Sequence, residues 1–397
     1  MNYRKSYEYA CSLIEQNAFD PRLIHSRWGS IRRRYANQSL RVRSSADFSS
    51  LLNSMLRELQ CSHAQLYTKN DIEYFQLIES FGDCRAQADS PVLRKAAGKG
   101  FRGIGAFTEH HGNELFVRWV LDGSPADRAG LKVGDQIMEV RGVNKDGLRC
   151  LASPTASSVT MHVRRSQQSQ QCMEVQVRPI QRKASGWFYN ATCKSAKIFE
   201  RAGTRIGYLH FWSSCGDEYE DLLREHIGRG LLRDADALLL DLRGLMGGAS
   251  PYLLNVFSPN TPILEYTYRN GSRERIDFQW RKPIAFLINE YTRSGHEVLA
   301  YGVKKYGIGE LVGTPSAGAV LAGRPYLLPD GNLLYLPIAD VSVDGQRLEG
   351  DPIQPTVHAN FVLPYANSHD GQLERGLDLL SKHKSSFPSS SHCTSAR

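Results

Sequence analysis

The sequence predicts a multidomain protein of the mixed α/β class, and three observations support this. At about 150 residues per domain, 397 residues exceed one compact core. Hydrophobic residues at 41% and charged residues at 23% are close to globular averages. The spacing of apolar residues changes twice along the chain. We therefore expect a helical segment over residues 1–90, a β-rich module over 91–182, an α/β core over 183–382 and a disordered tail over 383–397.

The first ninety residues have helical spacing. Apolar residues recur three and four positions apart, most clearly at Leu51, Leu52, Met55, Leu56 and Leu59. This pattern places them on one face of a helix. The segment is predicted to be all-α.

The next ninety residues alternate between apolar and polar side chains, which is typical of strands buried on one face. Turn-forming Gly, Asp and Ser residues separate the runs. The predicted strands are Glu114–Val120, Gln136–Arg141, Ser158–Arg164 and Met173–Ile180.

From Arg205 onward, short apolar runs alternate with helical stretches, as in a sheet covered on both faces. The predicted strands are Ile206–Trp212, Ala237–Leu242 and Ile284–Ile288, and the predicted helices are Glu218–Gly230, Pro251–Phe257 and Ser294–Tyr306. The pattern of Tyr326–Leu336 predicts a hairpin with its turn at Asp330-Gly331. The tail after Lys382 is rich in Ser and poor in apolar residues, which predicts disorder.

Composition and charge argue against several classes of function. The surplus of eight positive charges is compatible with a C-terminal carboxylate ligand, but no dense Lys/Arg run with interleaved aromatics indicates nucleic acid. The first twenty residues contain no signal-peptide core, and no apolar run is long enough to span a membrane. The eight cysteines are scattered without a C-x-x-C pair. We expect a soluble, cytoplasmic protein with no cofactor, no metal and no membrane or nucleic-acid partner.

The β-rich module carries Phe101-Arg102-Gly103-Ile104-Gly105, then the motif GSPADRAGL from Gly123 and the pair Gly134-Asp135. Together these residues resemble a PDZ domain of the kind found in C-terminal-processing proteases. The resemblance implies that residues 101–105 form a loop whose N–H groups bind a peptide's terminal carboxylate, while the peptide extends an open sheet edge. The alternative is that these glycines only make turns.

A glycine-rich turn, Asp241-Leu-Arg-Gly-Leu-Met-Gly247-Gly248, directly follows the predicted strand at Ala237. It resembles the DLRxNxGG turn of the same peptidases and of the tricorn core, with Leu245 and Met246 departing from the pattern. Glycines after a buried strand can direct N–H groups at an oxyanion without interference from a Cβ. A phosphate loop is disfavoured because no Gly-Lys-Ser/Thr follows.

The segment from Asn289 to Glu297 resembles the N-E-x-x-x-S-x-x-E segment of this family. The resemblance implies that Ser294 is the nucleophile at a strand-to-helix junction, where the helix dipole favours negative charge. It also implies oxyanion donors at Gly295 and at Gly247 or Gly248. The alternative is that Ser294 is an ordinary helix N-cap.

The sequence also distinguishes two branches of the family by their general base. The lysine of the Ser–Lys branch would fall at position 319, which is Ala319 here. Lys304 and Lys305 would lie roughly 15 Å along the helix from Ser294, which is too far for a hydrogen bond. The Ser62-His63 pair and Glu349 resemble the tricorn-like branch. That resemblance implies His63 as general base, supported by Glu349 through Ser62.

Two other histidines have structural explanations. His210 is expected to be a hydrogen-bonded histidine at a strand end. His296 lies about 200° around the predicted helix from Ser294 and should face elsewhere.

The resemblance as a whole implies a crotonase-like ββα core with an inserted PDZ domain and a helical segment that contributes Ser62-His63. We expect a serine endopeptidase that captures polypeptides through a C-terminus or an unstructured segment and cleaves them through an acyl-enzyme. The alternative is an inactive peptide- or ligand-binding protein that retains the fold. A homo-oligomer is compatible with either function.

Overall fold

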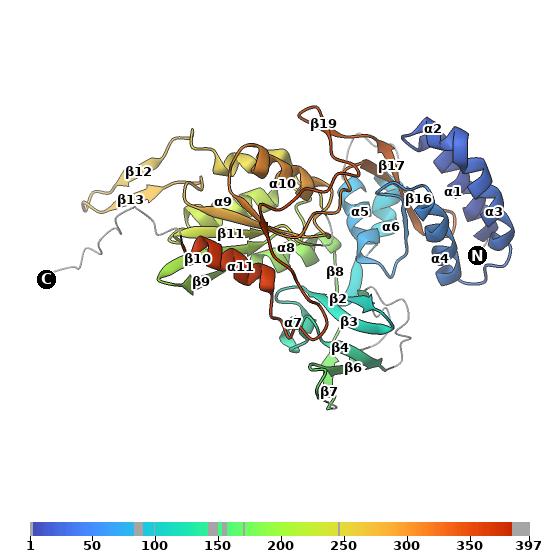
Figure 1. Cartoon of the computed structure of the whole chain (residues 1–397), viewed down its shortest axis with the longest axis horizontal. Coiled ribbons are helices and arrows are strands. Elements are labelled where there is room, and N and C mark those ends of the chain that lie inside the picture. Colours follow the sequence, from blue (N-terminus) through green and yellow to red (C-terminus); the bar gives the residue numbers. More distant parts are fainter. Residues whose placement is uncertain are drawn as a thin grey trace.

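The structure is a computed structural model that describes residues 3–82, 90–98, 100–141, 150–152, 157–169, 171–244 and 247–382. The predicted tail and the two departures at Leu245 and Met246 lie outside the described residues. Figure 1 shows helices α1 to α4 at one end of the long axis, the large sheet toward the other end and the β-rich module on one flank between them. The α/β class is confirmed.

The first part of the chain is mostly helical, as its spacing predicts, but the all-α prediction is wrong at strand β1, which pairs with β17 of the core. Ser44 caps α4, and Asp47 completes a capping box. The buried face of α4, which includes Leu52 and Met55, packs against Leu334 and Leu336. The elements are α1 Tyr3–Asn17, α2 Pro21–Leu23, the π-helix η1 Ile24–Trp28, α3 Gly29–Ser39, α4 Ser45–Arg57, β1 Gln65–Tyr67, α5 Ile72–Gly82 and α6 Ser90–Ala97.

The β-rich module contains a sheet in the order β5-β2-β3-β4-β6-β7, with β8 also paired to β2. Strand β6 alternates buried and half-buried residues, whereas β2 and β3 contain continuous buried runs. The core of the module includes Ile104, Val117 and Met161. The elements are β2 Phe101–His111, β3 Glu114–Val120, α7 Pro125–Arg128, β4 Gln136–Val140, β5 Cys150–Ala152, β6 Val159–Arg164, β7 Met173–Val177 and β8 Ile180–Arg182.

The α/β core is a six-stranded sheet in the order β20-β15-β14-β11-β10-β9. Neighbours from β10 to β20 pair in parallel, and β9 is antiparallel. The elements are α8 Ala184–Ser195, β9 Lys197–Arg201, β10 Thr204–His210, α9 Glu218–Gly228, β11 Ala237–Asp241, the 3-10 helix η2 Pro251–Phe257, β14 Ile284–Ile288, α10 Gly295–Lys305, β15 Glu310–Gly313, β20 Val357–His358 and α11 Gly371–Leu380.

Helices cover both faces of this sheet, which explains why its central strands read as continuous apolar runs. Leu238 and Leu240 of β11 face α9 and α10 through Leu223 and Leu299. Leu239, on the opposite face of β11, packs with Leu377 of α11. Every residue of β11 and of β14 is buried. The sheet therefore holds the carboxyl ends of these two strands in fixed positions.

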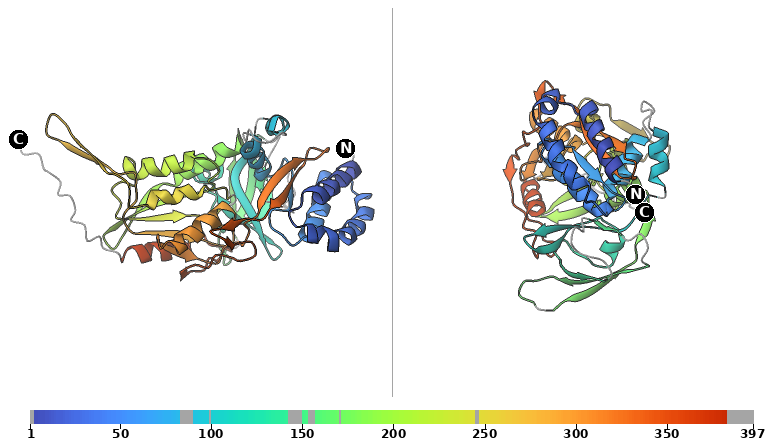
Figure 2. Two further views of the ribbon diagram at one scale, coloured as in Figure 1. Left: turned by 90° about the horizontal axis from the view of Figure 1, so that it is seen from above. Right: turned by 90° about the vertical axis from the view of Figure 1, so that its right-hand side faces the viewer.

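A hairpin joins the core to the helical segment. Strands β16 Ala322–Leu327 and β17 Leu333–Ala339 pair across the predicted Asp330-Gly331 turn, and β17 also pairs with β1. Figure 2 shows this hairpin, in orange, reaching from the core to the blue helices. The helical segment is thereby attached to the core by a sheet of its own.

Two further hairpins complete the described residues: β12 Leu264–Thr267 with β13 Arg273–Ile276, and β18 Ser342–Val343 with β19 Gln346–Arg347. The first projects from the end of the molecule far from α1 (Figure 1). In the described ranges, every helix is too short or too polar to cross a lipid bilayer.

Candidate active site

Ser62, His63 and Glu349 form one hydrogen-bonded relay. The backbone N–H of Ser62 donates to Glu349 Oε1 at 2.9 Å, and Ser62 Oγ donates to Glu349 Oε2 at 2.8 Å. Ser62 Oγ also lies 2.7 Å from His63 Nδ1. Since the single hydroxyl proton goes to the carboxylate, Ser62 Oγ must accept from Nδ1–H. The tautomer inferred for His63 therefore carries its proton on Nδ1 and leaves the Nε2 lone pair free.

Ser294 has a strained backbone immediately before α10. Its φ of 56° and ψ of −127° are unusual for a residue with a side chain, and its hydroxyl makes no capping hydrogen bond to the helix. Ser294 is therefore not an ordinary N-cap, because the hydroxyl of an N-cap serine accepts a hydrogen bond from an N–H group of the first helical turn. The half-buried hydroxyl is instead available at a helix N-terminus.

Two consecutive residues connect Ser294 to the relay. The N–H of Ser294 donates to the carbonyl of Ala319 at 2.9 Å, and the N–H of the next residue, Val320, donates to Glu349 Oε2 at 2.8 Å. The buried carboxylate of Glu297 holds this segment by accepting from the N–H groups of Gly318 and Ala319, each at 2.7 Å. The sequence pattern included Glu297 but did not give its role. In the described residues, no hydrogen bond joins His63 directly to Ser294.

The three glycines predicted as oxyanion donors pack tightly around Ser294. A Cβ built on Gly247 would lie 2.7 Å from Ser294 Cβ, and one on Gly295 would lie 2.1 Å from the backbone N of Ala249. Gly248 has a φ of +80°. Among the described residues, the N–H groups of Gly248 and Gly295 donate to no protein acceptor. Only glycine fits at these close approaches, and the free N–H groups can donate to a bound ligand.

A buried ion-pair network fixes the turn that carries Gly247. Arg243 donates to Asp241 at 2.6 Å and contacts Asp370 at 2.7 Å, and it also donates to Gln372 at 2.9 Å. Tyr208 donates to the same oxygen, Asp241 Oδ2, at 2.8 Å. The sequence showed Arg243 within the turn, but Asp370 and Gln372 lie in a region that no motif singled out.

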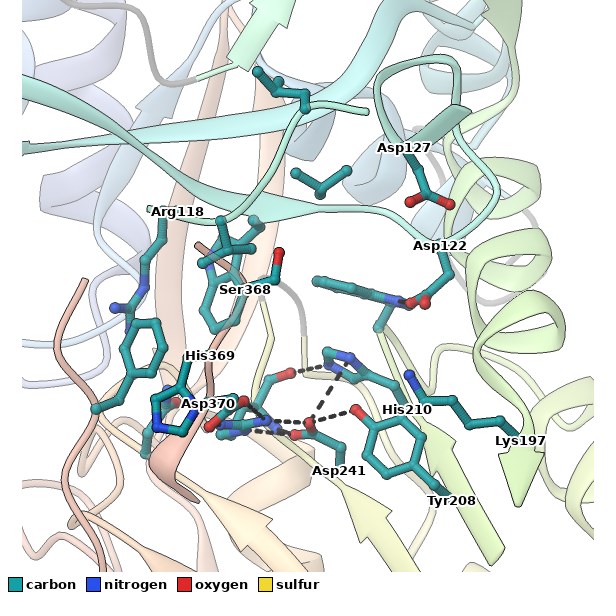
Figure 3. Close-up of a pocket in the computed structure, with 18 residues that line it drawn as sticks. Arg118, Asp122, Asp127, Lys197, Tyr208, His210, Asp241, Ser368, His369 and Asp370 are labelled. Carbon is teal, nitrogen blue, oxygen red and sulfur yellow. Dashed lines mark hydrogen bonds and ion pairs between the residues drawn. The ribbon is translucent and has the colours of Figure 1, made fainter. Parts of the chain in front are cut away.

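Figure 3 shows this network at one end of a cavity of about 250 Å³ between the β-rich module and the core. Asp122 and Asp127 lie on the module's side, and Lys197 and His210 lie on the core's side. Trp212 donates to Asp122 at 2.9 Å across this junction. The positive and negative side chains that line the cavity nearly balance, so its charge selects no class of ligand.

Burial and neighbouring charges perturb two titratable groups of the site. Burial, assisted by the charge of Arg293, lowers the pKa of His63 to about 3, which keeps the imidazole neutral and able to accept a proton. Burial alone would raise the pKa of Asp241, but the guanidinium of Arg243 outweighs it and holds that pKa at about 2. Asp241 is therefore an ionised anchor for Arg243.

The segment predicted as a carboxylate-binding loop is not a loop. Phe101, Arg102, Gly103, Ile104 and Gly105 form the first five residues of strand β2. Phe101 and Ile104 are buried, which draws the segment into the sheet. Gly103 pairs with β8 on one side and β5 on the other, so both edges are occupied here. Gly105 has a φ of +80° and packs against Ser124, which accounts for one glycine without a ligand.

The alternative bases and the other histidines have partners of their own. Lys304 donates to the carbonyl of Gln354, and Lys305 pairs with Asp344. His210 is buried at the end of β10, where it contacts the Arg243 carbonyl and stacks on Trp212. His296 is buried between Ser214 and the Leu242 carbonyl. The structural explanations of His210 and His296 are confirmed.

Comparisons with known proteins agree with this architecture. Residues 205–359 match the family model of peptidase family S41, and residues 116–165 match that of a PDZ domain. The carboxy-terminal processing protease CtpA of Bacillus subtilis is 25% identical over 290 residues, which cover 68% of this chain and 59% of CtpA. The carboxyl-terminal-processing protease of Synechocystis sp. is 23% identical, with 94% of this chain and 87% of that protein covered.

Among solved structures, the tricorn protease superposes on 96% of this chain with a TM-score of 0.55 and 20% identity, over 36% of its own length. This likeness concerns the fold. The matched domains, the relatives and the fold agree with one another. Residues 205–359 therefore carry a domain of peptidase family S41, and a PDZ domain at residues 116–165 precedes it in the chain.

Proposed function

We propose that this chain is a serine endopeptidase of the C-terminal-processing type, with Ser294 as nucleophile and His63 as general base. One observation supports the assignment most strongly. The Glu349–Ser62–His63 relay joins residues 287 positions apart, and two adjacent residues connect it to Ser294: Val320 donates to Glu349, and the Ala319 carbonyl accepts from the N–H of Ser294. A histidine with a fixed tautomer, connected in this way to a strained serine, supports acyl transfer as the chemistry of the site.

Each proposed step uses a group whose environment suits it. His63 Nε2 takes the proton of Ser294 Oγ as that oxygen attacks the substrate carbonyl carbon. The N–H groups of Gly248 and Gly295, with that of Gly247, stabilise the resulting oxyanion. His63 then gives its proton to the leaving amine as the peptide bond breaks. Water hydrolyses the acyl-enzyme through the same base.

Glu349 and Ser62 support the base without touching the substrate. The carboxylate, fixed by Ser62 and by the N–H of Val320, stabilises the imidazolium through the intervening hydroxyl. Ala319 occupies the position of the lysine in the Ser–Lys branch, and Lys304 and Lys305 are engaged elsewhere. These facts favour the tricorn-like arrangement over a Ser–Lys dyad.

The substrates proposed are polypeptides, as the names of the relatives suggest. The PDZ domain is the proposed docking site for a substrate C-terminus. Because β5 pairs with one edge of β2 at Gly103, a peptide could extend β2 at that point only after β5 moves away.

The chain spans 59% of the length of CtpA, so CtpA extends beyond the matched part. A homo-oligomer remains compatible with the proposal.

The proposal is tested on the purified chain with an unstructured polypeptide and a fluorophosphonate probe. Ser294→Ala and His63→Ala should each reduce cleavage by at least roughly 10³-fold, because nucleophile and base act as one unit. The probe should label the parent protein at Ser294. Circular dichroism controls for folding. Undiminished cleavage by folded Ser294→Ala would refute the assignment, and absence of both labelling and cleavage would favour an inactive binding protein.

A further inference from the structure

A second cavity, of about 410 Å³, lies where α5 meets the loop before α9. The residues that matter for its chemistry are Gln76, Glu79, Ser185, Cys215, Glu218 and Tyr219. They come from the helical segment, from α8 and from the loop and first turn at α9. The cavity therefore lies between the same two parts of the chain that supply His63 and Ser294.

This cavity adjoins the proposed oxyanion turn. The Cys215 thiol in its wall donates to the Gly247 carbonyl at 3.4 Å. A Cβ on Gly248 would lie 2.1 Å from Cys215 Sγ, and one on Gly247 would lie 2.7 Å from Ser294 Cβ. One residue therefore separates the cavity from the turn that packs against Ser294. A substrate whose carbonyl lies at Ser294 could place a nearby side chain in this cavity.

The cavity wall is electronegative. Glu79 and Glu218 line it, and within the described part of the chain none of its lining residues is Lys, Arg or His. Glu79 accepts the N–H groups of Ala184 and Ser185 at 2.9 Å each, which fixes its carboxylate at the start of α8. Glu218 is exposed and forms no ion pair among the residues that the structure describes. Two carboxylates without a cation favour a positively charged occupant.

Gln76 provides an independent indication of a hydrogen-bond donor. It is 2% exposed and lines the cavity, yet its Oε1 accepts no hydrogen bond from any described residue. Its Nε2 donates to Ser213 Oγ at 2.7 Å, which fixes the side chain. A buried acceptor without a partner costs about 1–3 kcal/mol. Because the oxygen itself is covered, a substrate N–H donor in the cavity would satisfy it after a small shift of the surrounding side chains.

We propose that this cavity binds a Lys or Arg side chain of the polypeptide substrate, close to the bond that Ser294 cleaves. The proposal rests on the proposed peptidase function and specifies its substrate. Lys offers three N–H donors and Arg five, each with a positive charge on a long apolar stem. The charge would face Glu79 and Glu218, and one donor would pair with Gln76 Oε1 once the side chains that cover this oxygen shift. A neutral or acidic side chain would leave these groups unpaired.

The first experiment maps cleavage sites in a peptide library by mass spectrometry. Lys and Arg should be enriched at one fixed position relative to the cut, with kcat/KM at least tenfold above that of the same peptide with norleucine at that position. Enrichment of apolar or acidic residues there, or equal rates for both peptides, would overturn the proposal. Cleavage that still requires Ser294 would leave the peptidase function standing in that case.

The second experiment uses charge variants with a matched control. Glu218→Gln and Gln76→Met should each lower kcat/KM for the Lys peptide at least fivefold and change it less than twofold for the norleucine peptide. The control is Glu220→Gln, on the same helix but paired with Arg224 and outside the cavity wall. Equal losses in Glu218→Gln and Glu220→Gln would contradict the proposal.

Binding separates this inference from catalysis. Ser294→Ala protein should bind the uncleaved Lys peptide at least tenfold more tightly than the norleucine peptide in a fluorescence anisotropy assay. This difference is expected even if the parent protein proves catalytically inactive. Equal affinities would overturn the basic-side-chain proposal whether or not the chain is a peptidase.

Discussion

Ser62 determines which nitrogen of His63 carries the proton. Its hydroxyl donates to Glu349 at 2.8 Å and therefore accepts from Nδ1. Without this hydroxyl, the carboxylate no longer reaches the ring and either tautomer can form. Ser62 is a positioning residue, since it acts on the substrate only through His63.

We predict that Ser62→Ala lowers kcat by about 10²-fold and leaves KM within about twofold, because outer partners of a functional histidine are typically worth 10–100-fold. Ser62→Thr, which retains a hydroxyl, should recover most of the loss. Steady-state kinetics on one fluorogenic peptide measures both constants. A similar loss in Ser62→Thr, or a change mainly in KM, would contradict the positioning role.

The buried state of His63 predicts an unusual pH profile. Because burial and Arg293 lower its pKa to about 3, the imidazole stays neutral far into the acid range. The apparent pKa of the acid limb of the kcat/KM profile should therefore lie well below about 6.5, the pKa of an ordinary histidine. Activity at pH 5.5 should stay within about twofold of that at pH 7.5.

The matched variant for this profile is Arg293→Gln. Loss of the positive charge should move the acid limb toward higher pH, since Arg293 contributes to lowering the pKa of His63. Rates across pH 4 to 8 on a substrate without titratable groups measure the shift. A limb near pH 6.5 in the parent protein would show that His63 is more solvated than the structure indicates.

At the scale of elements, one buried arginine ties the 241–248 turn to the start of α11. Arg243 is 4% exposed and contacts both Asp241 and Asp370. We predict that Arg243→Met lowers the free energy of unfolding by about 3–5 kcal/mol, because the buried carboxylate of Asp241 and the half-buried one of Asp370 lose their counter-charge. Urea unfolding monitored by tryptophan fluorescence measures the change.

The control for this prediction is a second arginine that forms ion pairs with α11. Arg201 pairs with Glu374 and Asp378, but its side chain is 37% exposed. Arg201→Met should cost less than about 1 kcal/mol, as expected for a solvated ion pair. Equal losses for the two variants would mean that the Arg243 network is no more important than a surface pair.

The strands that the sequence predicted well are rich in apolar residues. Strands Glu114–Val120 and Ile284–Ile288 have the predicted bounds, although the first is buried continuously from Leu115 to Trp119 and not on one face only. The β12–β13 hairpin was missed because its strand β12 is exposed along its whole length. Residues 101–105 were predicted as a carboxylate-binding loop from the resemblance to a PDZ domain. The segment forms a strand instead, because Phe101 and Ile104 are buried in the sheet.

For the site, the motifs nominated Ser62, His63, Ser294 and Glu349 individually, and the structure joins three of them in one relay. The connections through Ala319, Val320 and Asp370 could not be predicted. They are backbone bonds or long-range ion pairs, and such contacts impose no periodicity on a sequence. Gln76 likewise appears in the sequence as an ordinary helix residue, and only its buried, unpaired oxygen distinguishes it.

At the scale of the whole molecule, the proposed active site is built from more than one domain. The relay takes two residues from the helical segment and one from near the end of the core, and the β1–β17 pairing holds these parts together. Unfolding of the helical segment would therefore remove the base and leave the nucleophile in place. Conditions that destabilise the whole fold should also end activity.

Acid should be such a condition, because the fold buries neutral histidines from different parts of the chain. Burial lowers the pKa of His63 to about 3 and that of His296 to about 4. In the unfolded chain both bind protons near pH 6.5. The unfolded state therefore binds more protons at lower pH, and stability that is complete above about pH 6.5 is lost as the pH falls toward 4.

We predict that the free energy of unfolding falls between pH 6.5 and 4 with a slope of up to about 1.4 kcal/mol per pH unit for each of these histidines. Carboxylates such as Asp241, whose pKa is about 2, contribute mainly below this window. Urea titrations at half-unit pH steps measure the slope. The double variant His63→Gln/His296→Gln should flatten it, and a parent slope that the double variant retains would place the acid sensitivity in other groups.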